Sequence, residues 1–378
     1  MQITPFALER YFARHEFSAR YLLSSSDCES LSMTELIALS DAETRHLWDS
    51  LKLGYTETPG HPLLRQSIAD QYEGISIQDV MVMAPEEGIF LLMHALLEPG
   101  DHVVCTYPAY QSLHEIARSI GCQVTYWTPD ETHGWRFDVG QLEANLQPST
   151  RLVVVNFPHN PTGYLPSHSD FEALIDLVQR RGVYLLSDEM YRYLEIEEGA
   201  TLPAACELYD RAISLSGLSK AYGLPGLRIG WLAASAAEVL ERAAMLKDYT
   251  TICNSAPSEV LAIIALRNRE AILASQLERL RYNLGLLDAF FDSFSDCFQW
   301  NRPLAGSICF PRMTAVEDAY SFCEVLVQET GIMLVPSRVL QFGDNHVRMG
   351  FGRQNLPEVL SLFSNYLEQR IQPSAARK

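Results

Sequence analysis

The sequence has little of what a membrane protein or a nucleic-acid-binding protein requires. No stretch approaches the roughly 20 consecutive apolar residues of a membrane span, and residues 1–11 lack a signal-peptide pattern. Positive charge is scarce, since 29 Lys and Arg residues stand against 47 Asp and Glu residues and leave a net charge of −18. Because such a surface repels nucleic acid and anionic lipid, we expect a soluble, cytoplasmic protein without nucleic-acid or membrane partners.

The cysteines form no recognisable pattern either. The eight cysteines are scattered, without the CxxC or Cys/His spacing of a metal site, so we expect reduced thiols and no bound metal. The sequence also has no internal repeat, no low-complexity stretch and no charged tail. Its 378 residues are 47% hydrophobic and exceed what one compact core accommodates, which predicts two domains.

The most informative stretch is Ser216–Gly230, which reads SGLSKAYGLPGLRIG and contains Lys220. An apolar strand over residues 212–215 precedes it, and its glycines and proline disfavour a helix. A lysine at the end of a strand is ordinarily just solvated. Here Arg228 follows eight residues later, and its guanidinium group is suited to binding a phosphate.

This stretch resembles the lysine loop of the class I/II branch of the aspartate aminotransferase superfamily, which are fold-type I enzymes dependent on pyridoxal 5′-phosphate (PLP). The resemblance implies that Lys220 forms a Schiff base with PLP and that Arg228 binds the cofactor phosphate. Relatives often carry a phosphate-binding serine three residues before the lysine, where this chain has Gly217. Ser216 and Ser219 are the nearby substitutes, and Ser219 is preferred.

Two apolar strands that end in polar residues are also similar to this family. Residues 152–155 precede the Asn-Pro-Thr-Gly turn that begins at Asn160, and residues 183–186 precede Asp188. In relatives the asparagine hydrogen-bonds the phenolic oxygen of PLP, and the carboxylate keeps the pyridine nitrogen protonated so that the ring accepts electrons. The resemblance gives these roles to Asn160 and Asp188, and it gives Tyr191 a hydrogen bond to the phenolic oxygen.

Two further tyrosines match family motifs around the cofactor. Tyr110, between a strand over 103–107 and a helix over 112–120, matches the aromatic residue that stacks on the pyridine ring. Tyr55 matches the residue that reaches the phosphate of the neighbouring subunit's PLP, which implies a homodimer with shared active sites. Without the resemblance, both tyrosines would be interpreted as packing residues.

The turn before the apolar helix over 89–97 departs from the family pattern. A helix N-terminus offers free N–H groups and the positive end of the helix dipole to a phosphate. Relatives place a small residue and then Thr or Ser where this chain has Pro85 and Glu86, although proline lacks an N–H and a carboxylate repels phosphate. Either the amides of Glu86 and Glu87 bind while their side chains turn away as N-terminal caps, which we favour, or the phosphate is bound more weakly.

Two segments are candidates for substrate binding, together with Asn160. Arg348, in the segment HVRMGF, matches the family arginine that binds the substrate α-carboxylate, and an arginine in an apolar strand loses hydration unless it meets an anion. A salt bridge to an internal acid is the alternative. Ser25 belongs to a serine run over 24–26, where relatives usually carry a glycine. This run is either a loop cap for the following helix or a polar wall for an unusual substrate.

Strand and helix patterns alternate from residue 102, which predicts an α/β fold with a mainly parallel central sheet. We expect an N-terminal segment over 1–45 that packs with the small domain, a large PLP-binding domain over 46–280, and a small α+β domain over 281–378. Within the latter, strands are predicted over 307–313, 332–336 and 346–350.

The resemblance implies an aminotransferase that moves an amino group between an amino acid and a 2-keto acid. The alternative is a PLP-dependent lyase or other carbanion chemistry on a polar amino acid in specialised metabolism, because the motifs do not select which substrate bond breaks. A PLP-binding regulator is a third hypothesis. Regulators with this fold carry an additional N-terminal DNA-binding domain, for which the sequence leaves no room before Gly54.

Overall fold

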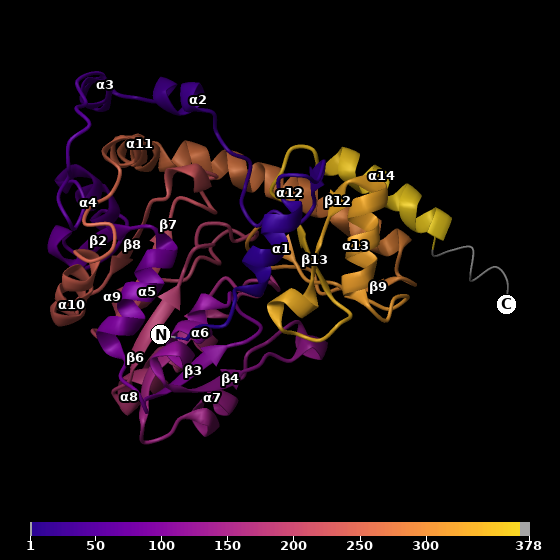
Figure 1. Cartoon of the computed structure of the whole chain (residues 1–378), viewed down its shortest axis with the longest axis horizontal. Coiled ribbons are helices and arrows are strands. Elements are labelled where there is room, and N and C mark those ends of the chain that lie inside the picture. The colour runs from indigo at the N-terminus through magenta and orange to yellow at the C-terminus, as the bar shows by residue number, and fades with distance from the viewer. Residues whose placement is uncertain (1, 371–378) are drawn as a thin grey trace.

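The computed structural model describes residues 2–370, and it confirms the α/β fold with a mostly parallel central sheet (Figure 1). Within these residues the central sheet has seven strands in the order β2-β8-β7-β6-β5-β3-β4, and β8 runs antiparallel to both of its neighbours. The strands are β2 (Val80–Met83), β3 (His102–Thr106), β4 (Gln123–Trp127), β5 (Thr150–Asn156), β6 (Tyr184–Asp188), β7 (Ala212–Gly217) and β8 (Gly230–Ala233).

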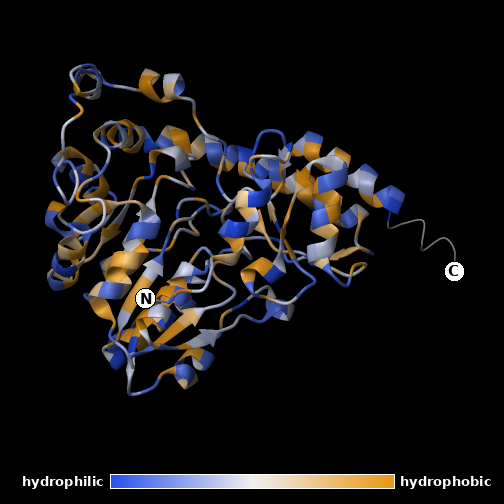
Figure 2. Cartoon of the chain, in the orientation of Figure 1, coloured by the Kyte–Doolittle hydropathy of each residue, from blue (hydrophilic) through white to orange (hydrophobic). Residues whose placement is uncertain are grey.

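Helices cover both faces of this sheet. They and the nearby short helices are α4 (Pro62–Ala69), α5 (Pro85–Leu96), α6 (Ser112–Ile120), α7 (Val139–Asn145), α8 (His168–Arg181), α9 (Ala205–Leu208), α10 (Ala237–Lys247), α11 (Ala256–Arg267), η1 (Ile77–Asp79), η2 (Glu131–His133) and η3 (Pro225–Leu227). In β5, Leu152 and Val154 pack in the cluster that contains α5 and α6, whereas Val153 and Val155 pack in the cluster that contains α7 and α8. Because both faces of the central strands are buried, these strands are rich in hydrophobic residues, as the orange segments in Figure 2 show.

A second region is built from both ends of the chain. The long helix α12 (Arg269–Ser293) leads to it from the large sheet (Figure 1). It holds a three-stranded antiparallel sheet, β10-β14-β13, and two strand pairs, β1-β12 and β9-β11. Its elements are α1 (Ala7–His15), β1 (Tyr21–Leu22), β9 (Phe298–Gln299), β10 (Ile308–Cys309), β11 (Arg312–Met313), α13 (Ala319–Thr330), β12 (Ile332–Met333), β13 (Val335–Pro336), η4 (Ser337–Leu340), β14 (Val347–Gly350) and α14 (Leu356–Arg370). The short helices α2 (Met33–Ala38) and α3 (Ala42–Asp49) instead pack on α11 (Figure 1).

The N-terminal segment lies directly against β14. The Gly350 N–H donates to the Leu23 carbonyl at 2.8 Å, and a Cβ at Gly350 would lie only 1.8 Å from the Ser25 carbonyl oxygen. Only a glycine permits this approach of two backbones. The contact places residues 24–26 beside the side chain of Arg348, which belongs to the same strand.

Two predicted strands of this region are shorter than expected. The strand predicted over 307–313 is interrupted at Phe310 and Pro311, because proline cannot donate a ladder hydrogen bond. The strand predicted over 332–336 divides at Leu334, since its two halves pair with β1 and β14 respectively. The expected domain boundaries at 45/46 and 280/281 stay predictions. Among residues 2–370, no helix is long and apolar enough to span a membrane.

Candidate active site

The expected cofactor-binding residues gather at the carboxyl edge of the central sheet. Asn156 ends β5 and Asp188 ends β6, and these two residues are direct partners in the parallel ladder. Lys220 follows the end of β7, and Asn160 follows the end of β5 by four residues. Since parallel strands end at a common edge, residues that are separated by up to 60 positions in the sequence share one site.

Asp188 is buried at this edge. Its Oδ1 atom accepts a hydrogen bond from the Met190 N–H at 3.2 Å. Burial raises the pKa of Asp188 to about 7, and the Met190 bond and the charge of Lys220 oppose this rise. The adjacent Glu189 instead accepts from the Ser214 hydroxyl at 2.7 Å and from the Ala205 N–H at 2.9 Å. Both donors bind Oε1 of Glu189, whose Oε2 has no partner among the described residues, whereas Asp188 accepts a single hydrogen bond. The carboxyl of Asp188 therefore retains accepting capacity for a cationic ligand.

The amine of Lys220, at the same edge of the sheet, donates to the Ser26 hydroxyl at 2.7 Å. Burial lowers the pKa of Lys220, the carboxylates of Asp27 and Asp188 raise it, and Arg348 lowers it. A lower pKa increases the fraction of neutral amine, which is the form that attacks a carbonyl or accepts a proton.

The serine run contacts both functional cations. The Ser24 carbonyl accepts from Arg348 at 3.2 Å, and the Ser26 hydroxyl accepts from Lys220. Ser25, the residue chosen from the sequence, packs its main chain on Gly350 instead. The interpretation as a cap for the following helix is wrong, because α2 is capped by Ser32. Ser26 was missed since the sequence does not reveal which of three adjacent hydroxyls faces inward.

Arg348 is 1% exposed and has free hydrogen-bonding capacity. Its Nη1 donates to Asn160 Oδ1 at 3.3 Å, and its Nη2 donates to the Ser24 carbonyl. Its Nε has no partner, and no carboxylate within residues 2–370 lies within 4.0 Å of the guanidinium. The alternative of an internal salt bridge is therefore wrong. A buried guanidinium without a counter-ion is suited to an anionic ligand.

The backbone at the start of α5 is open to a ligand. Ala84 is the N-cap residue without a side-chain hydrogen bond, and Pro85 is the first helical residue. The first amide bonded in the helix is that of Gly88, which donates to the Ala84 carbonyl. The amides of Glu86 and Glu87 have no partner among the described residues. They point outward from the helix end, as a phosphate site requires.

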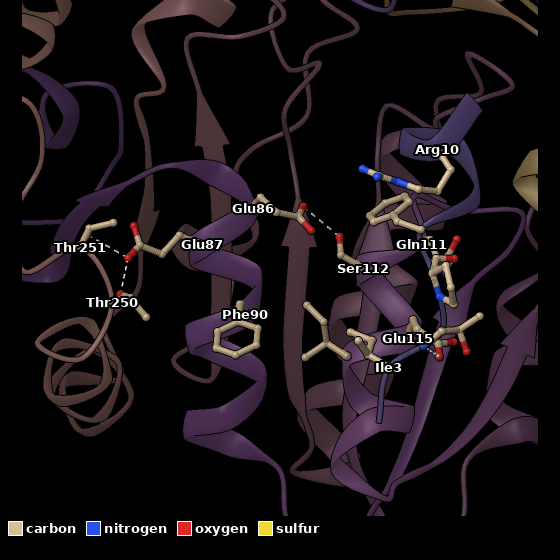
Figure 3. A pocket seen from close by; sticks show the side chains of 14 residues that line it. Ile3, Arg10, Glu86, Glu87, Phe90, Gln111, Ser112, Glu115, Thr250 and Thr251 are labelled. Carbon is tan, nitrogen blue, oxygen red and sulfur yellow. Dashed lines mark hydrogen bonds between the residues drawn. The ribbon is translucent and has the colours of Figure 1, made fainter. Parts of the chain in front are cut away.

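The two glutamate side chains do not cap the helix, contrary to expectation. Glu87 accepts hydrogen bonds from the hydroxyls of Thr250 and Thr251, and Glu86 accepts one from the Ser112 hydroxyl at 3.1 Å (Figure 3). Both side chains bind hydroxyl donors of neighbouring segments. The amides at the start of α5, which a capping side chain would have bound, therefore stay free.

Pro85 and Gly217, the two positions where the chain departs from the family pattern, lie in contact with each other. A Cβ at Gly217 would lie 3.2 Å from Cγ of Pro85 and 3.0 Å from Cα of Gly230. A side chain at 217 would therefore be crowded by the backbone of Ile229 and Gly230 and by the ring of Pro85. Ser219, the preferred substitute, has a buried hydroxyl without a partner. The exposed Arg228 bonds only the nearby Pro225 carbonyl, at 2.9 Å, and so its guanidinium is available.

The three tyrosines lie in different surroundings. Tyr191 is buried, and its hydroxyl has no partner among the described residues. Tyr110 donates to Glu9 Oε1 at 2.9 Å, and its ring lies 4.8 Å from that of Phe6. Tyr55 is 91% exposed, so a single chain does not bring it into the cluster.

Residues behind the site fix its two loops, and the sequence did not single them out. Asn156 donates to the Asp188 carbonyl at 3.0 Å and accepts from the Asn160 N–H at 2.8 Å. His159 bonds the Pro108 carbonyl at 2.9 Å, and burial lowers its pKa to about 3, so it stays neutral. A polar residue that ends an apolar strand was the available signal for Asn156.

The residues present fit a PLP molecule. Buried polar atoms in proteins nearly always have hydrogen-bond partners. Among the described residues, the buried polar atoms without a partner include Ser24 Oγ, Ser219 Oγ, Tyr191 Oη and Arg348 Nε. Together with the free amides of α5 and the carboxyl of Asp188, they offer donors to a phosphate, a phenolic oxygen and a carboxylate, and an acceptor to a ring nitrogen.

Comparison with known sequences decides the family. The profile described as "Aminotransferase class I and II" matches residues 21–361. The chain belongs to this family. Class I and II aminotransferases use PLP, which is therefore the cofactor of this chain. Enzymes of the family act on amino acid and keto acid substrates.

Individual relatives of this aminotransferase-family chain differ in their named activities. Capreomycidine synthase from Streptomyces vinaceus is 33% identical over 365 residues, which cover 95% of this chain and 93% of that protein. A PLP-dependent aminotransferase from Streptococcus suis is 32% identical, with a TM-score of 0.91 and coverage of 98% and 99% of the two chains. The PLP-dependent cyclase OrfR is 28% identical, with a TM-score of 0.90 and coverage of 98% of each chain.

Proposed function

We propose that the protein is an aminotransferase that binds an amino acid through Arg348, uses the amine of Lys220 to move the α-proton, and passes the amino group to a 2-keto acid. PLP supplies the electron-accepting ring that stabilises negative charge at the substrate Cα. The observation that carries this proposal is the unpaired, buried guanidinium of Arg348 near the amine of Lys220, whose pKa it lowers.

The remaining residues bind and orient. We assign Asp188 to the pyridine nitrogen, Asn160 and Tyr191 to the phenolic oxygen, and Tyr110 to the ring face. The phosphate is assigned to the amides of Glu86 and Glu87, to Ser219 and Arg228, and to Tyr55 of a second subunit in a homodimer. Because its pKa is lowered, Lys220 can act as a neutral amine. In this form it would accept the proton from the substrate Cα and donate it to C4′ of the cofactor.

A second candidate is carbanion chemistry other than amino transfer on a polar amino acid, and the N-terminal helix favours it. Glu9 and Glu16 are seven residues apart at the two ends of α1 and so lie on one side of it. Phe12 lies between them, with its ring 5.8 Å from Cζ of Arg348, so this side faces the site. Burial, and the negative charges of Glu9 and Asp27, raise the pKa of Glu16.

These carboxylates favour a substrate whose side chain carries a positive charge. The carboxyl of Glu16 has no hydrogen-bond partner among the described residues, whereas that of Glu9 accepts a hydrogen bond from Tyr110. The relatives named as capreomycidine synthase and as a cyclase also support an outcome other than amino transfer.

One experiment separates the two candidates. The PLP-loaded protein is incubated with basic, neutral and acidic amino acids, with and without a 2-keto acid, and the products are scored for new keto acid, ammonia, pyruvate and loss of water. Transamination requires the added keto acid and conserves the amino group. Without a keto acid, transamination yields at most one equivalent of product per active site, so repeated turnover under these conditions supports the second candidate. The absence of both product formation and α-proton exchange refutes both.

A further inference from the structure

Glu86 is placed where an acidic residue conflicts with the cofactor. It is the second residue of α5, and its own amide is one of those assigned to the phosphate. Its side chain lines a cleft of about 750 Å³ and bonds the Ser112 hydroxyl, as Figure 3 shows. No Lys or Arg within residues 2–370 lies within 4.0 Å of its carboxyl. The charge of an ionised Glu86 would therefore be left uncompensated beside a phosphate dianion.

The surroundings of Glu86 are mostly acidic. Burial raises the pKa of Glu86 to about 7, the Ser112 bond lowers it, Glu9 and Asp188 raise it, and Arg228 lowers it. The titratable and charged groups that face it or the same cleft come from α1, α5, α6, the loop before α6, β6 and η3; they are Glu9, Arg10, Glu87, Glu115, Tyr110, Asp188 and Arg228.

The phosphate site also lacks donors at two positions. Pro85 has no N–H, and Gly217, which has no side chain, lies where its ring and the backbone of Gly230 leave little room for one. A neutral carboxylic acid at Glu86 would offer an O–H donor in this region, whereas an ionised carboxylate would only repel the phosphate.

We propose that Glu86 is a neutral carboxylic acid in the cofactor-bound protein, so that the phosphate-bearing cofactor binds together with one proton. This proposal rests on the phosphate site proposed above, but not on the reaction. Above about pH 7 the free protein has an ionised Glu86, and binding must then take up a proton. The affinity for the phosphate-bearing cofactor should therefore fall about tenfold for each pH unit above about pH 7, and the contribution of Glu86 to it should be constant below that pH.

The test measures protons rather than activity. Full-length protein freed of cofactor is titrated with pyridoxamine 5′-phosphate, which cannot bond covalently to Lys220, by calorimetry near pH 8 in buffers of different ionisation enthalpy. Pyridoxamine, which lacks the phosphate, is the control ligand. Its binding measures the proton uptake that is due to the pyridine ring and the amine alone. We expect the phosphate ester to take up about one proton more than pyridoxamine in wild type. The difference should vanish in Glu86→Gln and persist in Glu87→Gln, whose parent carboxylate is bonded by Thr250 and Thr251.

An equal extra proton uptake in wild type and Glu86→Gln would assign the proton to the phosphate and overturn the proposal. If Glu86→Gln fails to fold by circular dichroism, difference infrared spectroscopy of the wild type gives the answer. Cofactor binding near pH 8 should convert a carboxylate band into a carboxylic-acid band, and the absence of this change would overturn the proposal. Since these measurements use no amino acid substrate, failure of the proposed reaction would leave their outcome unchanged.

Discussion

Truncation of Arg348 to alanine should weaken the use of amino acids far more than the binding of PLP. The guanidinium is 1% exposed and has no carboxylate partner among the described residues, so a substrate carboxylate would meet a charge that is desolvated and unpaired. Loss of one partner of such a pair costs about 2–5 kcal/mol. At about 1.4 kcal/mol per factor of ten, kcat/KM should fall roughly 30- to several thousand-fold.

The alanine variant also removes two hydrogen bonds from the guanidinium to neutral acceptors, Asn160 Oδ1 and the Ser24 carbonyl. Arg348→Lys therefore accompanies it, because lysine retains the charge but cannot form a bidentate pair, and it should recover only part of the lost rate. Arg338→Ala is the matched control, since Arg338 is exposed and pairs with Asp318 and Asp344 away from the site.

The assay is single-turnover kinetics with a good amino donor, alongside the absorbance spectrum of the bound cofactor. Wild type and variants are also compared with the amines that correspond to the donor without its carboxylate, and here we expect equal rates. Unchanged saturation by amino acids in Arg348→Ala would refute the role of this guanidinium in substrate binding.

The other substitutions test separate parts of the site. Lys220→Ala should abolish borohydride-dependent covalent retention of PLP, which peptide mapping locates, while Lys52→Ala should retain it; label on Lys52 or Lys247 in wild type would contradict the assignment. Asp188→Asn should keep PLP but slow α-proton exchange by roughly 100-fold or more, because the ring nitrogen loses the carboxylate that keeps it protonated. Equal exchange rates in variant and wild type would show that this carboxylate has another role. Glu16→Gln should weaken basic amino acids about tenfold relative to neutral ones and leave PLP binding unchanged; an equal loss for both classes would assign Glu16 to folding.

Local patterns were sufficient for the elements that carry the site. Residues 152–155 and 183–186 are apolar without interruption because their strands are buried on both faces, and this signal does not depend on distant residues. The turns that follow place Asn160, Asp188 and Lys220 at strand ends, so their common edge follows from the parallel order of the strands. The family motifs were readable for the same reason, since each lies within about a dozen consecutive residues.

The details around the phosphate could not be obtained in this way. Whether Glu86 and Glu87 cap α5 depends on which donors lie nearby, and the hydroxyls of Ser112, Thr250 and Thr251 belong to other elements. The sequence showed proline and glycine as two separate departures from the family pattern. Their contact across α5 and β7 is visible only when both are placed in space.

The sequence by itself was sufficient to predict the fold class and the cofactor, both of which are confirmed, and it singled out Lys220 and Arg348 as candidate site residues, because these predictions depend on residue types at fixed spacing along short segments. Only the tertiary structure decided that Ser26 contacts Lys220 and that the main chain of Ser24 holds Arg348. It also decided that Glu9 of α1 lies close enough for its charge to raise the pKa of both Lys220 and Arg348. These contacts join segments about 200 to 325 residues apart. They arise where Gly350 lets the N-terminal backbone approach β14, and no local pattern records such a packing.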